Sequence, residues 1–222
     1  MLLPTVVIRS CPNGFSASVK FIAFFALFWS VAFSVAAADG KAIFSANCIA
    51  CHGSKGEGNA QLGAPNIGGM EASYLARQLA NFSSGIRGSA ANDNYGAQMR
   101  AVVAVLKTDA DRTAVANYVA GMPRAVSKNV IKADLANGST QFNAVCSSCH
   151  GSHAQGNQQM GAPSLLGTDP QYVERQILAF RTGLRGVKPE DKTGALMRVG
   201  ANMLPDVKSA HDVAAYITTI KP

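Results

Sequence analysis

Two short motifs in the chain combine thiols and an imidazole at a spacing that suits covalent attachment of haem. Residues 48–52 read Cys-Ile-Ala-Cys-His, and residues 146–150 read Cys-Ser-Ser-Cys-His, 98 positions further along. In a C-x-x-C-H motif the two thiols form thioethers with haem vinyl groups, and the histidine ligates the iron. The sequence therefore predicts two covalent c-type haems, bound by Cys48, Cys51, Cys146 and Cys149, with His52 and His150 as iron ligands.

The two motifs lie inside a long internal repeat. When residues 40–124 are aligned without gaps on residues 138–222, 31 of the 85 positions are identical. The identities extend well beyond the motifs, for example to Gly-Ala-Pro at 63–65 and 161–163. A period of this length indicates a tandem duplication of a domain, because the units of a solenoid run to roughly 20–50 residues.

The repeat also selects a second iron ligand in each half. Of the seven methionines, only Met99 and Met197 fall on one another when the halves are aligned, and each lies 47 residues after its motif histidine. A lone methionine usually fills space in a core. A methionine at the same distance from both motifs is better explained as an axial ligand, and a histidine–methionine pair raises the potential of the iron. We expect the remaining histidines, His153 and His211, to face solvent.

Other uses of the cysteines fit less well. Of five cysteines, Cys11 lies in the N-terminal segment and the other four belong to the motifs, so no thiol remains for a disulfide framework. A zinc site would usually bring its C-x-x-C pairs within about 15–20 residues of each other. A thioredoxin-type pair would need a βαβ context, and no strand-like alternation surrounds either motif.

The N-terminal segment resembles an export signal. Residues 21–36 are almost wholly apolar, positive charge precedes them at Arg9 and Lys20, and Ala36-Ala37-Ala38 suits cleavage before Asp39. The alternative is an uncleaved membrane anchor, since a spanning helix needs about 20 apolar residues. We expect residues 1–38 to be a signal peptide, residues 39–121 a first domain, 122–138 a linker and 139–222 a second domain, located in the periplasm.

The pattern of apolar residues and breakers predicts an all-α fold that repeats in both halves. We expect helices over 40–48, 71–82 and 109–121, and over 138–146, 169–180 and 209–220. Glycine-rich loops should surround haem at 54–70 and 152–168. The two methionines should lie at or near short helical turns.

These features make the chain similar to a tandem pair of class I cytochrome c domains, and specifically to the dihaem cytochrome c4 family. The resemblance covers residues 39–222. It implies that the first and last helices of each domain cross, which would bring Phe44 near Tyr118 and Phe142 near Tyr216. It also implies that the carbonyls of Pro65 and Pro163 bind the haem histidines, and that the domains pack about a pseudo-two-fold axis. Leu196 stands where the first half has Gln98.

Charge excludes some partners and suggests others. The formal net charge of +7 falls to +5 without Arg9 and Lys20, and each half carries eight basic and six acidic side chains. Without a basic run, nucleic-acid binding has little support. Three arginine pairs could instead bind haem propionates, because guanidinium forms bidentate bonds with carboxylates: Arg77 and Arg175, Arg87 and Arg185, Arg100 and Arg198.

Two functional classes follow from these predictions. The first is a periplasmic electron carrier and not an enzyme; the resemblance implies a quinol:cytochrome c reductase as donor and a terminal oxidase as acceptor. A variant of this class is the haem subunit of a periplasmic dehydrogenase. The second class is a dihaem peroxidase, which needs one iron with an open coordination position; two equivalent methionines argue against it. Peripheral or anchored membrane association stays open in either class.

Overall fold

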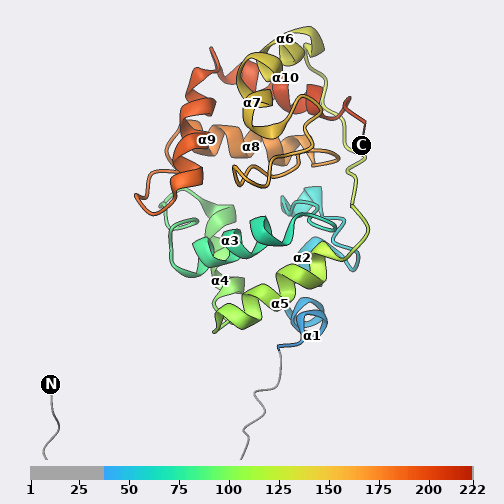
Figure 1. Ribbon diagram of the computed structural model, residues 1–222, viewed down its shortest axis with the longest axis vertical. Helices are drawn as coiled ribbons and strands as arrows, with labels where there is room; N and C mark the ends of the chain where they lie inside the picture. The colour runs from blue at the N-terminus through green and yellow to red at the C-terminus, as the bar shows by residue number, and fades with distance from the viewer. Residues whose placement is uncertain (1–37, 222) are drawn as a thin grey trace, which may run out of the picture. The chain divides into compact units, whose positions relative to one another are not determined.

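The computed structural model describes residues 38–221, and their regular elements are helices (Figure 1). Two isolated β-bridges, Asn59–Ala64 and Asn157–Ala162, accompany them. The first half contains α1 (Gly40–Asn47), α2 (Ile49–His52), a 3₁₀ turn (Ala60–Leu62), α3 (Ala72–Ser83), α4 (Asn94–Val103) and α5 (Asp109–Ala120). The predicted all-α fold is confirmed. The predicted signal segment lies outside the described residues, apart from Ala38.

The second half repeats the order of the first. It contains α6 (Leu135–Gln141), a π-helical turn (Phe142–Cys146), α7 (Ser147–His150), α8 (Pro170–Arg181), α9 (Lys192–Met203) and α10 (Val207–Ile217). Two expectations need correction. Helix α6 begins inside the segment predicted as a linker, because the Asp134 side chain accepts a hydrogen bond from Asn137 N and caps it there. The methionines lie on helices of 10 and 12 residues, α4 and α9, and not on short turns.

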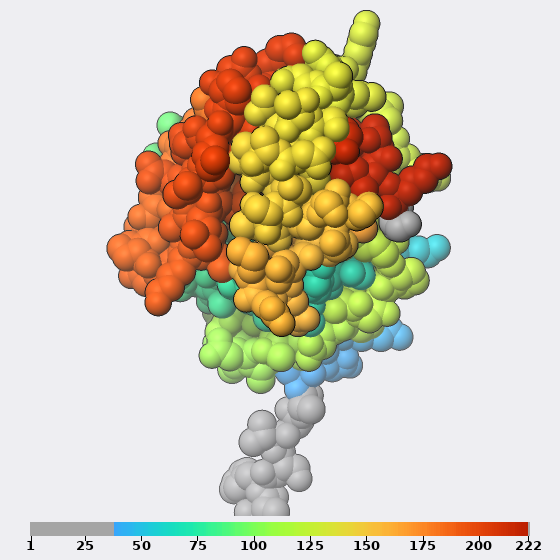
Figure 2. All heavy atoms as spheres, turned by 45° about the horizontal axis from the view of Figure 1, so that its top comes forward, coloured from blue at the N-terminus to red at the C-terminus, as the bar shows by residue number. Residues whose placement is uncertain are grey.

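The first and last helices of each half cross at a glycine. The rings of Phe44 and Tyr118 lie 5.6 Å apart, and those of Phe142 and Tyr216 lie 5.7 Å apart, which confirms the predicted pairs. A Cβ on Gly138 would lie 2.2 Å from the carbonyl oxygen of Asp212 on α10. Glycine at this crossing therefore lets two helix backbones approach directly. Figure 2 shows the yellow segment that includes α6 between the orange-red and red segments of the same half.

The segment between the halves is bound along its length. Ala125 N donates to Gly68 O, and Ser127 N donates to Gly167 O, so the segment touches the loops that follow both motifs. The Arg124 guanidinium donates to Leu166 O at 2.7 Å. These bonds hold it against both halves.

Within residues 38–221 no helix combines the length and the apolar character that crossing a bilayer requires. The apolar run at 21–36 is outside this range.

Candidate functional site

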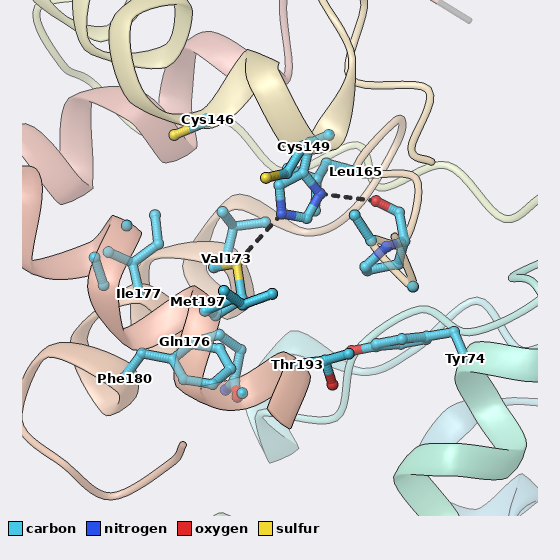
Figure 3. Close-up of a pocket in the computed structure, with 18 of the residues that line it drawn as sticks. Tyr74, Cys146, Cys149, Leu165, Val173, Gln176, Ile177, Phe180, Thr193 and Met197 are labelled. Carbon is cyan, nitrogen blue, oxygen red and sulfur yellow. Dashed lines mark hydrogen bonds between the residues drawn. The ribbon is translucent and has the colours of Figure 1, made fainter. Parts of the chain in front are cut away.

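Helices α7 and α9 bring together the two residues that the sequence nominated in the second half. His150 is the last residue of α7, and Met197 lies in the middle of α9. The Nε2 atom of His150 and the Sδ atom of Met197 face each other at 3.3 Å across the pocket in Figure 3. The two side chains therefore meet inside the pocket, and to bind one metal from opposite sides their atoms would separate by about 1 Å, since metal–nitrogen and metal–sulfur bonds are about 2.0 and 2.3 Å long.

A backbone carbonyl fixes the orientation of the His150 ring. Nδ1 lies 2.9 Å from the carbonyl oxygen of Pro163, so Nδ1 carries the proton and donates it. The other ring nitrogen, Nε2, is then left with its lone pair directed at Met197. Burial lowers the pKa of His150, against smaller opposing effects of the Pro163 hydrogen bond and the charge of Glu71. The ring is therefore neutral at physiological pH, which is the form that ligates a metal.

The first half has the same arrangement around its histidine. His52 Nδ1 lies 2.8 Å from the carbonyl oxygen of Pro65, so the predicted proline contact is confirmed in both halves. His52 is 6% exposed and His150 5% exposed, and burial lowers the pKa of His52 as well. Met99 lies on α4 at the position that Met197 has on α9. In the described part of the chain no hydrogen bond joins Met99 to His52.

The second-half pocket has a predominantly apolar wall. Val173, Ile177 and Phe180 of α8 line it together with Leu165, and Cys146, Cys149 and His150 line it as well (Figure 3). Burial and the neighbouring Cys149 raise the pKa of Cys146 to about 12, and burial with Cys51 raises that of Cys48 to about 11.

The first half contributes to this pocket, which the sequence did not reveal. Met70, Tyr74 and Arg77 of the first half line it alongside residues of the second half. The pocket is also lined by Arg185, and the Nε atoms of Arg77 and Arg185 are buried without a hydrogen-bond partner. An apolar cavity with thiols and an imidazole at one side and unsatisfied guanidinium donors in its lining fits haem, which is an apolar ring that bears two carboxylates.

Two arginines and two glutamines form a closed ring of hydrogen bonds between the halves. Arg87 donates to Gln78 at 2.8 Å and to Gln176 at 3.0 Å. Arg185 donates to Gln176 at 2.6 Å and to Gln78 at 2.9 Å. Both guanidinium groups are buried and neither forms an ion pair with a carboxylate within residues 38–221. The interface therefore buries two positive charges held only by neutral acceptors.

The other two arginine pairs differ from this one. Arg77 donates to the carbonyl oxygen of Gly161, and Arg175 donates to that of Gly63, both at 2.6 Å. These reciprocal bonds across the interface are what the predicted pseudo-two-fold packing requires. Arg100 and Arg198 are exposed instead.

The two remaining histidines behave differently from each other. His153 is exposed, as expected. The expectation that His211 faces solvent holds only in part: its side chain is 33% exposed, but its Nδ1 lies 3.0 Å from a Glu174 carboxylate oxygen and its Nε2 lies 3.1 Å from Lys132 O. Its role is to join α10 to α8 and to the segment before α6. No cluster of three or more histidine, cysteine or acidic side chains able to hold a metal ion occurs among residues 38–221.

Both halves of the chain match the same family of known proteins. The family model described as Cytochrome c matches residues 37–123 and again residues 135–221. A thiosulfate dehydrogenase electron acceptor from Thiomonas intermedia (strain K12) is 34% identical over 170 residues, which cover 74% of this chain and 75% of that protein. A cbb3-type cytochrome c oxidase subunit FixP from Bradyrhizobium diazoefficiens is 36% identical over 164 residues, covering 70% of this chain and 54% of that protein.

Among solved structures, reduced recombinant cytochrome c4 from Pseudomonas stutzeri superposes with a TM-score of 0.64 at 26% sequence identity. The superposition covers 82% of this chain and 96% of the cytochrome. Because it extends over nearly all of that protein, the likeness includes both halves.

Proposed function

Since the chain belongs to the cytochrome c family, with two tandem domains of the dihaem cytochrome c4 type that hold two covalent c-type haems, we propose that it is a periplasmic carrier of single electrons. Its place would be between a quinol:cytochrome c reductase and a terminal oxidase. When bound, haem supplies an iron that gains and loses one electron at a time. The residues around the iron determine whether a substrate can also bind to it.

His52 and Met99 in the first half, and His150 and Met197 in the second, are the proposed axial ligands. The proposed thioether links are at Cys48, Cys51, Cys146 and Cys149. With a histidine and a methionine as its ligands, the iron at each site would keep no position at which a substrate could bind. The methionine thioether favours the reduced state, and the proline carbonyls keep each imidazole in one tautomer and orientation.

The observation that carries this proposal is the 3.3 Å approach of Met197 Sδ to His150 Nε2. An enzyme that reacts with peroxide needs an iron with an open axial position, whereas in the second half a side chain already faces the histidine, and in the first half Met99 holds the aligned position on α4. The test is a steady-state peroxidase assay on the purified dihaem protein, with oxidation of its reduced form by a haem-copper oxidase measured in parallel. Negligible peroxidase turnover with fast oxidation supports a carrier, and substantial turnover refutes it.

A second candidate partner is a periplasmic dehydrogenase. It is favoured by the Thiomonas relative, a thiosulfate dehydrogenase electron acceptor that aligns over three quarters of both chains. In this role the protein would receive electrons from the dehydrogenase and pass them on by the same chemistry. Two initial rates of haem reduction distinguish the donors. One is measured with thiosulfate dehydrogenase and thiosulfate, and the other with quinol:cytochrome c reductase and quinol.

The proposed location in the periplasm depends on residues 1–38 acting as an export signal. N-terminal sequencing of the protein purified from its native host tests this directly. A mature chain that begins at Asp39 supports a cleaved signal, and a chain that retains residues 21–36 and fractionates with membranes supports an anchor.

A further inference from the structure

One acidic side chain of the first half reaches the peptide group that holds the haem histidine of the second half. The Oε1 atom of Glu71, just before α3, accepts a hydrogen bond of 3.0 Å from the backbone N–H of Ser164. That N–H belongs to the same peptide group as the carbonyl of Pro163, which accepts the Nδ1–H of His150 at 2.9 Å. A carboxylate, one peptide group and the imidazole are therefore connected in series.

The Glu71 charge is sheltered. Its second oxygen, Oε2, is buried and has no hydrogen-bond partner. None of the ion pairs among residues 38–221 includes Glu71. The nearby Arg124 guanidinium donates instead to the carbonyl oxygen of Leu166. The charge of Arg124 offsets part of the Glu71 charge, but the direct 3.0 Å bond to Ser164 N–H applies the carboxylate to the Pro163–Ser164 peptide, and low solvent access strengthens that interaction.

The corresponding acidic residue in the second half has a different role. Asp169 aligns with Glu71, but its carboxylate accepts hydrogen bonds from Ser127 Oγ and from Tyr172 N at the start of α8. Asn66 aligns with Ser164, and its backbone N–H donates no hydrogen bond within the described part of the chain. The Asn66 side chain accepts from Asp169 N instead. The series of carboxylate, peptide and histidine exists only in the second half.

We propose that Glu71 is a positioning residue that lowers the reduction potential of the second-half haem relative to the first. A carboxylate that accepts from a peptide N–H shifts electron density to the carbonyl oxygen, which becomes a stronger acceptor for Nδ1–H. The imidazole then donates more charge to the iron, which stabilises the oxidised state. The inference rests on the proposed function, because it takes His150 as an iron ligand.

The test replaces Glu71 by Gln, which keeps the size and an oxygen that can accept from Ser164 but removes the charge. Both potentials are measured by spectroelectrochemistry, and each is assigned by following the axial methionine methyl NMR signals in partly oxidised samples. We expect electron occupancy to shift toward the second-half haem by about tenfold, a rise of about 59 mV for a one-electron centre. The matched control is Asp169→Asn, the same charge change at the aligned position, which should leave the first-half haem potential nearly unchanged.

A second measurement separates the peptide connection from a general effect of charge. The His150 Nδ1–H proton signal of the fully reduced protein should move upfield in Glu71→Gln, because its hydrogen bond weakens, while the His52 signal stays in place. Equal shifts of both haems, no shift, or a changed potential with an unmoved His150 proton would each overturn the proposal. The haem content of each variant is measured independently, so loss of haem ligation would count against the proposed function and not against Glu71.

Discussion

The ring of four hydrogen bonds at the interface, two of which cross from one half to the other, should contribute strongly to the association of the halves. Replacing Gln176 by Leu removes an acceptor that binds both Arg87 and Arg185, at 3.0 and 2.6 Å. Each arginine keeps its bond to Gln78, and Arg87 also keeps Tyr172 OH at 3.2 Å. A hydrogen bond to a charged group contributes about 1.5–3 kcal/mol when it is buried.

Two lost bonds therefore predict a cost of about 3 kcal/mol, at the lower end of the summed range because water and Tyr172 offset part of it. The measurement is guanidinium-induced unfolding of the dihaem protein, followed by circular dichroism and by haem absorbance. Gln159→Leu, at an exposed position, is the control and should change stability by less than about 0.5 kcal/mol.

A double-mutant cycle with Gln78→Leu sharpens the test. Removal of both glutamines takes from each arginine every acceptor in the ring, so the double variant should lose more than the sum of the single losses. Strict additivity, or a Gln176→Leu cost no greater than that of the exposed control, would show that the ring does not hold the buried charges.

Four further outcomes follow from the structure. Met99→Ala and Met197→Ala should each remove about half of the near-infrared band of methionine-to-iron ligation in the oxidised protein, and retention of the full band would refute that ligand. Gly138→Ala should destabilise the second half by about 2–3 kcal/mol in thermal unfolding, because its Cβ would lie 2.2 Å from a carbonyl oxygen of α10. A redox titration of the intact chain should show two resolvable one-electron steps. The halves expressed separately should not reproduce both reduction potentials, because the bonds across the interface are lost. Unchanged potentials would indicate independent domains. Finally, the Lys132 carbonyl and Glu174 raise the pKa of His211. The stabilising effect of His211 is therefore full below about pH 6.5 and is lost as the pH rises through the raised pKa. His211→Gln should flatten this pH dependence of the free energy of unfolding, and an unaltered profile would contradict the assignment.

The sequence alone determined the chemistry of this protein because covalent attachment and ligation depend on residue type and short spacing. A C-x-x-C-H motif places both thiols and the imidazole within about one helical turn wherever it folds. The duplication then acted as an internal comparison: Met99 and Met197 stood out because no other methionine recurs at its aligned position. Helix positions were also accessible, since apolar periodicity and breakers are local signals.

Helix boundaries and the length of the methionine helices were less accessible. Asp134 begins α6 earlier than the apolar pattern indicates, through a single side-chain hydrogen bond to Asn137 N. Asp191 caps α9 in the same way through Gly194 N. A cap depends on the local backbone geometry as well as on residue type, and many aspartates in a sequence do not form one.

Only the tertiary structure decided how the two halves affect each other. The arginines were candidates for haem propionates in the sequence, but nothing in it could show that Arg87 and Arg185 share two glutamines across an interface. Glu71 and Asp169 align in the repeat and differ by one methylene, yet one binds the opposite haem loop and the other caps its own helix. Contacts between residues about 90 positions apart depend on how two folded surfaces meet, and a repeat in sequence does not require the two copies to make equivalent contacts.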